Sequence, residues 1–408
     1  MVIYCARPED WIPGLQSVPL AKIAGVLAVV GLVFAIGSNR QRLPQEVVFL
    51  ILLLVQLCLT VPMSPVWRGG AFQNTLAFSK VVPIVIVMVW TVNSLARLRH
   101  ILFIQSASVA IIAGVAVWKS RSMGGRLEGV LNGNYSNPND LAFSIVLTLP
   151  LCLILFFGAR NRIAKLMWVI ALLVMIYAVF ATASRGGFLS LIVATAVCLW
   201  EFAVRGRRRY LLLVAVITGI VFWTYAAGGV KQRFNSTFDD NNEQENTAYG
   251  SAQERRELLT KSLNLTAQHP FFGIGPGNFA EVSGHWRETH NSYTQMSSEG
   301  GVLAFVFYVL ILRRGFVNLR GVKRLVRGSR ELNLMASGLR ASLAGFVVGS
   351  FFASEAYQFF PYFLIAYTTT LYRVAARESI ASNVRETVDL ESQDLQPLDM
   401  ALPSRGSA

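Results

Sequence analysis

Four ionisable residues lie within or at the edges of long apolar runs of the sequence: Lys80, Arg185, Glu299 and Glu355. A charge in such a position is costly unless it faces a cavity or a partner, so these residues are the first candidates for chemistry. The distribution of Lys and Arg along the chain places all four toward the same side of a membrane. One cavity open to that side could hold them all.

Arg185 stands in the segment Ala183-Ser184-Arg185-Gly186-Gly187. The two glycines allow backbone or substrate to approach closely, and the start of the following helix supplies free N–H groups and a partial positive charge. These features predict a phosphate-binding site. The alternative is an anchoring role, in which Arg185 extends its guanidinium to the lipid headgroups.

His290 opens the segment His290-Asn291-Ser292-Tyr293 and precedes Glu299 by about two and a half helical turns. The two side chains could therefore lie near one face of a helix. A histidine accepts a proton from a hydroxyl near neutral pH, which makes His290 a general-base candidate supported by Asn291, Glu299 and Lys80. The alternative is an interfacial histidine that is hydrogen-bonded to lipid or to a loop.

Two further cations, Arg255 and Arg256, begin an amphipathic segment that runs from Gln253 to Gln268. Guanidinium groups match phosphate oxygens in a bidentate way, so either residue could reach an anionic headgroup. A solvated helix face is the alternative. The acidic stretch 239–245 lacks the glycine-punctuated spacing of a calcium-binding loop, and we expect no metal and no other cofactor.

Several familiar catalytic motifs are missing from the sequence. It contains no H-E-x-x-H, no G-x-x-x-x-G-K-[ST] and no G-x-S-x-G. Their absence argues against a zinc protease, an ATP-driven pump built on a phosphate-binding loop, and a serine hydrolase. Of the functions considered, the one that remains is an enzyme that acts on an anionic substrate carried in the membrane.

The elements that must position these residues are predicted to be transmembrane helices. Hydrophobic residues make up 53% of the chain and charged residues 15%, and the mean hydropathy is +0.47. The net charge of +14 is spread over short clusters between apolar runs, which is a topology signal and does not indicate a nucleic-acid-binding domain. Runs long enough to cross a bilayer lie near 18–37, 44–63, 74–94, 98–118, 139–158, 163–181, 185–204, 209–227, 291–312, 338–356 and 358–374.

These runs predict an all-α, polytopic integral membrane protein with about eleven transmembrane helices and one large loop on the non-cytoplasmic side. Helices 1–8 would occupy 18–227 and helices 9–11 would occupy 290–375, with the loop at 228–289 between them. The segment 1–17 would lie outside and 376–408 would form a disordered cytoplasmic tail. An outside N-terminus without a cleavable signal suggests that a further helix precedes Met1 in the natural chain.

Four stretches between residues 130 and 310 resemble a known family. They are Asn134-Tyr135-Ser136-Asn137-Pro138-Asn139-Asp140; Ala183 to Gly187; Arg255 followed by His269-Pro270-Phe271-Phe272-Gly273-Ile274-Gly275-Pro276-Gly277-Asn278-Phe279; and His290 to Tyr293 with Glu299-Gly300-Gly301. In this order, and on the outer side of the predicted topology, they resemble the O-antigen ligase and polymerase family of bacterial membrane glycosyltransferases. The N-terminal third is similar only in being helical.

The resemblance implies a function and a set of roles. Members of this family take a glycan from an undecaprenyl diphosphate carrier at the periplasmic face of the inner membrane and join it to an acceptor hydroxyl, without a nucleotide sugar or a required metal. Arg185 and Arg255 would hold the diphosphate and neutralise its growing charge, and a one-residue slip in the match would give Arg256 the second role. His290 would orient or deprotonate the acceptor hydroxyl. The partners would be the carrier-linked glycan, membrane lipid, and an acceptor glycan or lipid A core.

Other functions stay open at this point. A polysaccharide polymerase or a protein O-oligosaccharyltransferase of the same family would share the carrier and differ in the acceptor. A membrane transporter or a lipid-linked glycan flippase belongs to another class, and would more often show two related halves with discontinuous helices. The sequence shows no such repeat.

The charge pattern makes a testable topology prediction. Reporter fusions after Arg209 and after Arg327 should report a cytoplasmic location, because these connections are rich in Lys and Arg, and a fusion near Asn242 should report the periplasm. Paired alkaline phosphatase and green fluorescent protein fusions measure this directly. A cytoplasmic signal at Asn242 would invert the topology and remove every site assignment with it.

Overall fold

The computed structural model is helical throughout most of its length, as expected of an all-α polytopic membrane protein. It describes residues 43–119, 122–123, 126–129, 137–206, 208–225, 248–284, 286–325 and 329–394, with short pieces between residues 14 and 31. In this part of the chain eight helices are long and apolar enough to cross a bilayer. The first predicted span, 18–37, lies largely outside the described residues.

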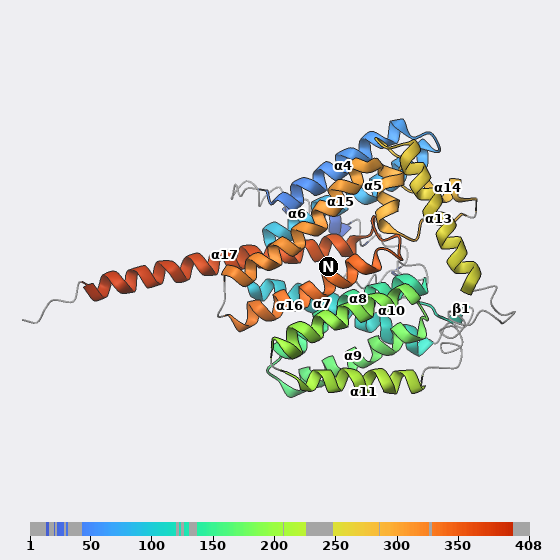
Figure 1. The fold of residues 1–408 in the computed structure, drawn as a ribbon. Helices are drawn as coiled ribbons and strands as arrows, with labels where there is room; N and C mark the ends of the chain where they lie inside the picture. Colours follow the sequence, from blue (N-terminus) through green and yellow to red (C-terminus); the bar gives the residue numbers. More distant parts are fainter. Residues whose placement is uncertain are drawn as a thin grey trace, which may run out of the picture.

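The elements are mostly helices, which pack side by side in a bundle (Figure 1). They are α4 (Gln45–Met63), α5 (Arg68–Ser79), α6 (Val81–Thr91), α7 (Leu95–Lys119), β1 (Ser122–Met123), β2 (Arg126–Leu127), α8 (Pro138–Gly158), α9 (Arg162–Ala181), α10 (Arg185–Cys198), the π-helix η1 (Leu199–Val204), α11 (Tyr210–Tyr225), α13 (Ala248–Gln268), α14 (Phe279–Ser283), α15 (Ser292–Leu325), α16 (Arg330–Gly349) and α17 (Phe359–Asp394). The two strands pair in a short antiparallel hairpin.

The spanning helices coincide with eight of the predicted runs, and α5 and α6 together form one of them. The predicted runs 209–227 and 358–374 correspond to α11 and α17, which are helical but are not among the eight. The count of eleven therefore stays a prediction. The run expected at 338–356 starts earlier, because Ser329 caps α16 by accepting a hydrogen bond from the Leu332 N–H at 3.4 Å.

The C-terminal segment differs from the irregular tail expected from residue 376. α17 continues as a helix to Asp394, and residues 395–408 lie outside the described residues. The segment 376–394 contains neither glycine nor proline. A helix that is already formed inside the bundle can extend through such a sequence at little cost.

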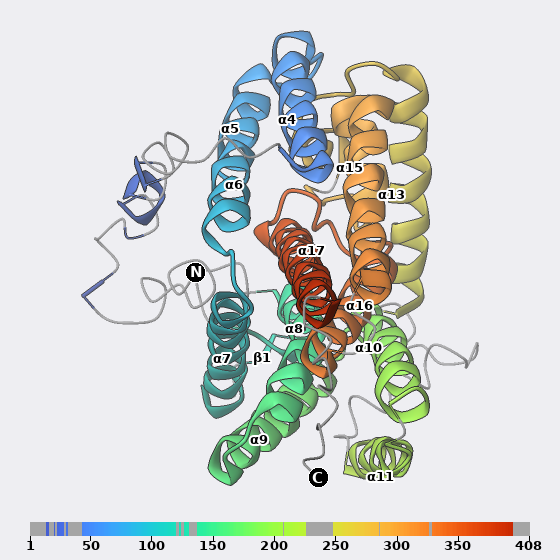
Figure 2. The same ribbon diagram turned by 90° about the vertical axis from the view of Figure 1, so that its left-hand side faces the viewer.

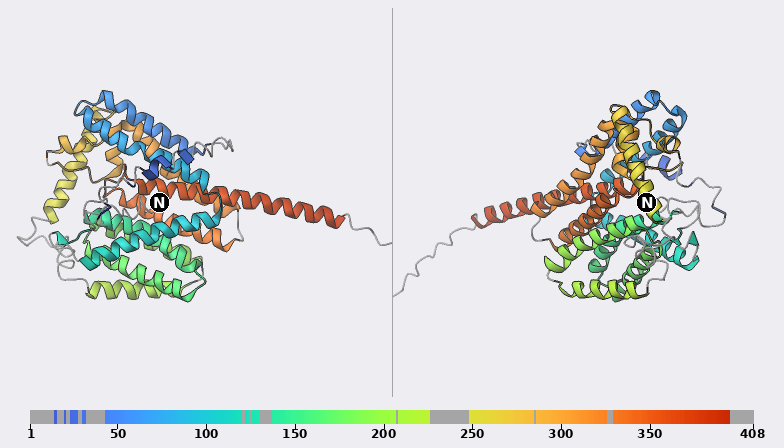
Figure 3. Two further views of the ribbon diagram at one scale, coloured as in Figure 1. Left: turned by 180° about the vertical axis from the view of Figure 1, so that it is seen from behind. Right: turned by 45° about the vertical axis from the view of Figure 1, so that its right-hand side comes forward.

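Two buried apolar clusters hold the bundle together, and α8 lies between them. α4, α6, α15, α16 and α17 build the larger cluster, while α7, α8, α9 and α10 build the smaller one. Most of α8 is buried, whereas only 22% of α9 is buried, and α9 offers an apolar surface suited to lipid. Seen from behind, α4 and α5 form one edge of the bundle, and α9 and α11 form the opposite edge (Figure 3).

A loop and one amphipathic helix cover one end of the bundle. α13 packs along α15, so that the two helices run side by side (Figure 2). The expected amphipathic segment from Gln253 to Gln268 is part of α13, and the helix ends just before His269-Pro270. Residues 226–247 of the predicted loop lie outside the described residues.

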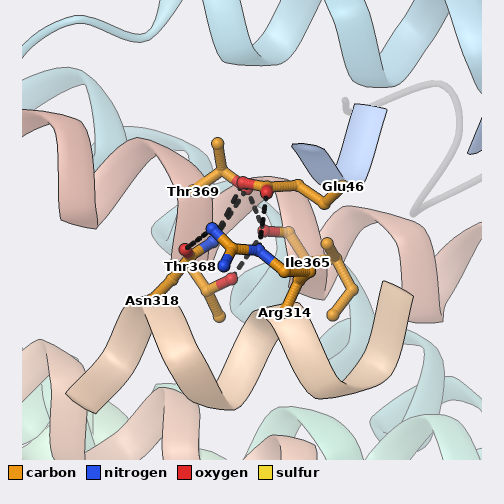
Figure 4. Close-up of polar contacts among 6 residues, drawn as sticks. All are labelled: Glu46, Arg314, Asn318, Ile365, Thr368 and Thr369. Atoms are coloured by element: carbon orange, nitrogen blue, oxygen red, sulfur yellow. Dashed lines mark hydrogen bonds and ion pairs between the residues drawn. The ribbon is translucent and has the colours of Figure 1, made fainter. Parts of the chain in front are cut away.

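The other end of the bundle contains a buried polar network that joins α4, α15 and α17 (Figure 4). The Glu46 carboxylate accepts hydrogen bonds from Asn318 Nδ2 at 2.9 Å and from Thr369 Oγ1 at 2.5 Å. Arg314 Nε lies 3.6 Å from the second carboxylate oxygen. Asn318 and Thr369 satisfy one carboxylate oxygen, whereas the second oxygen has the charge of Arg314 nearby but no hydrogen-bond donor among the described residues.

A second network at this end joins η1 to α15 and α16 around Glu201. Lys323 Nζ donates to its carboxylate at 2.5 Å, Arg340 at 3.0 Å and Ser337 at 3.1 Å, and Arg205 lies at 3.6 Å. The Glu201 side chain is only 3% exposed. One buried carboxylate thus fixes three positive charges from neighbouring elements.

This network predicts an effect on stability. Glu201→Ala should lower the free energy of unfolding by about 3 kcal/mol, because it leaves Lys323 and Arg340 partly buried without a counter-ion. Thermal unfolding of the detergent-solubilised protein, followed by size-exclusion chromatography, measures the loss. Glu331→Ala is the matched control, since Glu331 pairs with Arg99 at an exposed site and should cost at most about 0.5 kcal/mol. Equal losses in both variants would contradict a special role for Glu201.

Candidate active site

Arg185 is the first residue of α10, at the end of the bundle that α13 covers. Ser184 caps the helix by accepting a hydrogen bond from the Gly187 N–H at 3.2 Å. A Cβ atom on Gly186 would lie 2.6 Å from Phe352 Cβ, and one on Gly187 would lie 2.7 Å from Ala142 Cβ. The two glycines therefore let the start of α10 pack against α8 and against the connection between α16 and α17.

The hairpin between α7 and α8 fixes the turn that precedes Arg185. Arg126 on β2 donates to the Thr182 carbonyl oxygen at 2.9 Å and to Asn139 Oδ1 at 2.7 Å. One guanidinium thus joins the end of α9 to the first turn of α8. The sequence analysis missed Arg126, although the connection that holds it also carries Lys119 and Arg121 and is more basic than the other short outer connections that were predicted.

His290 lies just before α15, in a backbone conformation that its neighbours hold in place. Its φ angle is +51°, in the left-handed region that few residues other than glycine adopt. Asn291 Oδ1 accepts hydrogen bonds from the N–H groups of Tyr293 at 2.9 Å and Thr294 at 3.2 Å, so Asn291 caps α15. Ser292 Oγ donates to the Ala353 carbonyl oxygen at 2.6 Å and joins this segment to the connection after α16.

Arg255 and Arg256 point to different sides of α13. Arg255 is half-buried toward the bundle, whereas Arg256 is exposed and lines a hollow on the outer face with Thr260 and Lys261. The neighbouring Glu254 carboxylate accepts a hydrogen bond from Arg287 at 2.5 Å, which joins α13 to the segment before His290. The helix period thus places Arg255, and not Arg256, on the side facing the candidate site.

Arg185, Arg255 and His290 lie close enough for their charges to interact, and we call them the cationic centre. Burial lowers the pKa of Arg255, and the charge of Arg185 lowers it further. Burial likewise lowers the pKa of His290 below its ordinary value of 6.5. The positive charges of Arg255 and Arg287 lower this pKa further. A neutral imidazole is therefore the favoured form of His290 at neutral pH.

Three carboxylates border the cationic centre, and we call Asp140, Glu288 and Glu355 the carboxylate group. Asp140 lies in the first turn of α8, Glu288 two residues before His290, and Glu355 between α16 and α17. Burial raises the pKa of Glu355 well above its ordinary value, and the charges of Asp140 and Glu288 raise it further. Glu288 is exposed, Asp140 is half-buried and Glu355 is buried.

Glu299, expected as a supporting group, fastens the glycine-rich loop 273–279 to α15. Its carboxylate accepts hydrogen bonds from the Gly277 N–H at 2.9 Å and the Phe279 N–H at 3.1 Å. The carbonyl oxygens of Ser298 and Glu299 accept hydrogen bonds from the N–H groups of Ile274 at 2.8 Å and Gly275 at 2.9 Å. The loop is therefore docked mainly through its backbone.

The docking requires a break in α15 and glycines on both sides of it. Gly301 has a φ angle of +82°, which interrupts the helix and frees the carbonyl groups that the loop uses. A Cβ atom on Gly273 would lie 2.5 Å from the backbone of Glu299. Gln56 on α4 closes the arrangement by donating to the carbonyl oxygens of Phe271 at 2.8 Å and Gly300 at 3.0 Å.

The remaining sequence candidate lies elsewhere. Lys80 is exposed at the break between α5 and α6, and its side chain makes no hydrogen bond or ion pair in the part of the chain that the structure describes. The same part contains no group of three His, Cys, Asp or Glu side chains arranged to hold a metal ion. Residues 134–136 of the first family-like stretch lie outside the described residues.

One family model matches part of the chain. Residues 170–309 match a family model described as O-antigen ligase. The matched segment contains the whole cationic centre, the docked loop and the break in α15. No curated protein matches the chain. Over residues 170–309 the chain is thus similar to the O-antigen ligase family, which supports the resemblance drawn from the sequence motifs.

Proposed function

We propose that the chain moves a glycan from an undecaprenyl diphosphate carrier to an acceptor hydroxyl at the periplasmic face of the inner membrane, as an O-antigen ligase in lipopolysaccharide assembly. The observation that carries the proposal is the cationic centre. Two guanidinium groups from different elements, α10 and α13, are held close enough to disfavour each other's charge. A diphosphate between them would convert this repulsion into attraction, with bidentate hydrogen bonds on both sides.

The position of the centre suits a lipid-borne anion. Arg185 lies at the end of a membrane-spanning helix, and α13 brings Arg255 over the same end of the bundle. A diphosphate at the bilayer surface can reach this level while its lipid chain stays among the helices. The free N–H groups at the start of α10 add a partial positive charge.

The chemistry then divides between the donor and the acceptor. The acceptor oxygen attacks the anomeric carbon from the side opposite the diphosphate and forms the new glycosidic bond. The bond from the anomeric carbon to the phosphate oxygen breaks, and its electron pair leaves with the diphosphate, whose charge Arg185 and Arg255 stabilise. The acceptor proton passes to neutral His290, so the three residues account for every charge that develops.

The ligase function is favoured over its alternatives by the matched family model, whose description is O-antigen ligase. A polymerase or a protein O-oligosaccharyltransferase would use the same donor chemistry with another acceptor. Transport or flipping would not require a base beside the diphosphate site. The glycan that accumulates when the protein is lost separates these functions.

Substitution of Arg185 or Arg255 should abolish function, and the neighbouring Arg256 provides the control. In a strain without the chromosomal gene, plasmids carrying Arg185→Ala or Arg255→Ala should leave full-length polymer on the carrier, because the leaving diphosphate loses its counter-charge. Arg256→Ala, on the exposed side of α13, should restore wild-type attachment. Gel profiles of lipopolysaccharide and of carrier-linked glycan measure both. Single repeats in place of polymer would indicate a polymerase, and full activity in Arg185→Ala would show that Arg185 is only an anchor.

His290 predicts a loss of transfer without a loss of donor binding. His290→Asn keeps a side chain that tolerates a positive φ angle but removes the base, so transfer should fall by about 10²-fold or more. In the wild type, transfer should decline on acidification through the lowered pKa of His290, because protonation removes the base. Turnover in reconstituted membranes, normalised to folded protein, measures both effects. Wild-type turnover in His290→Asn would exclude a catalytic role.

A further inference from the structure

Arg126 joins three segments that are far apart in the sequence. It lies on β2, in the hairpin found at the same end of the bundle as α13 (Figure 1). Its Nε donates a hydrogen bond to the Thr182 carbonyl oxygen at 2.9 Å, and its Nη2 donates to Asn139 Oδ1 at 2.7 Å. A guanidinium group can make both bonds at once because its donors form a rigid planar fork, whereas a lysine ammonium has a single nitrogen. Arg126 is half-buried, so solvent only partly screens these bonds.

The carbonyl oxygen that Arg126 binds belongs to the peptide group between Thr182 and Ala183. The N–H of the same peptide group, on Ala183, donates to the Phe180 carbonyl oxygen at 3.0 Å. Thr182 is buried and is fastened further, since its hydroxyl donates to the Val179 carbonyl oxygen at 2.7 Å. The peptide group is therefore held from both sides, by α9 through its N–H and by the hairpin through its carbonyl oxygen.

The residue that follows this carbonyl group has an unfavourable backbone conformation. Ala183 has a φ angle of +47°, in the left-handed region, where its Cβ atom crowds the backbone. Among the described residues other than glycine, only Trp286 and His290 share this feature. Such a conformation persists when its surroundings over-determine it, and it is common where a site is pre-organised. The hydrogen bond from Arg126 supplies part of that constraint.

The turn at Ala183 determines how the chain enters α10 and therefore where Arg185 lies. Only Ser184 separates the two residues, and Ser184 caps the helix by accepting a hydrogen bond from the Gly187 N–H at 3.2 Å. A change of φ at Ala183 would rotate all the residues that follow it. The Arg185 guanidinium is at the end of a long side chain, so a small rotation of the backbone displaces it by a larger distance.

The second acceptor of Arg126 belongs to the helix on which α10 packs. Asn139 lies in the first turn of α8, three residues before Ala142, so the two side chains are near the same face of that helix. A Cβ atom on Gly187 would lie 2.7 Å from Ala142 Cβ, so α10 touches α8 at this level. Arg126 thus fixes the turn before α10 relative to the same helix that α10 contacts.

We propose that Arg126 is a positioning residue for Arg185: by holding the peptide group before Ala183, it directs the Arg185 guanidinium toward the carrier diphosphate. The inference rests on the proposed transfer from undecaprenyl diphosphate. Arg126 acts through Arg185 and does not itself contact the donor. Without its two hydrogen bonds the turn relaxes, and part of the free energy of binding that Arg185 supplies is used to restore the turn.

The test is a double-mutant cycle of Arg126 and Arg185, measured as the Kd of undecaprenyl diphosphate for the purified protein in nanodiscs. Arg126→Lys keeps the positive charge but cannot bond to both acceptors, so the Kd should rise about tenfold. In an Arg185→Ala background the same substitution should change the Kd by less than about twofold, because the residue that Arg126 positions is missing. Arg68→Lys, at the exposed start of α5, is the matched control and should leave the Kd unchanged.

Two outcomes would overturn the proposal. A wild-type Kd in Arg126→Lys would show that a positive charge at residue 126 is sufficient, and equal losses in both backgrounds would show that Arg126 acts independently of Arg185. Should Arg126→Lys fail to accumulate, Asn139→Ala takes its place, because it removes one acceptor and leaves the charge. It should raise the Kd about threefold, and only when Arg185 is present. The proposed function fails in a different way, when the wild type binds no undecaprenyl diphosphate or when Arg185→Ala alone leaves the Kd unchanged.

Discussion

The break in α15 at Gly301 is the constraint on which the candidate site depends. A helix that is interrupted near a membrane must find partners for the carbonyl groups it frees, and here the glycine-rich loop 273–279 supplies them through Ile274 and Gly275. The same loop ends α13 and starts α14, so its docking holds α13 along α15. This contact brings Arg255 over the bundle. His290 is held in place by the part of α15 that lies before the break.

The break also explains the composition of the motif Glu299-Gly300-Gly301, in which an acid precedes two glycines. Gly301 adopts the positive φ angle, Gly300 packs where a Cβ atom would lie 2.6 Å from Ala304, and Glu299 accepts two N–H groups of the loop. Each residue has a separate physical task. The motif is therefore a docking device for the loop, and its effect on chemistry is indirect, through the position of the residues on either side of it.

The two ends of the bundle treat buried charge differently. At the end that the charge pattern assigns to the cytoplasm, Glu46 and Glu201 are surrounded by donors from other helices, and these networks join the helices to one another. At the opposite end, the positive charges of Arg185 and Arg255 lie close enough to disfavour each other. Like charges held together in this way lower the stability of the empty protein and favour ligands that carry the opposite charge or hydrogen-bond donors.

The sequence by itself determined the class of the fold and most of the helix positions, because long apolar runs must cross a bilayer as helices whatever their neighbours are. It also singled out Arg185, Arg255 and His290, through their positions beside such runs and the order of the surrounding motifs.

The sequence could not decide between Arg255 and Arg256, which differ only in the side of α13 they occupy. It placed Glu299 and Lys80 in a supporting role, whereas the fold uses the first to dock a loop and leaves the second exposed. Only the tertiary structure brought Arg185 and Arg255 together and revealed Arg126 as a connector, because these contacts join segments that are far apart in the chain and depend on how the helices pack.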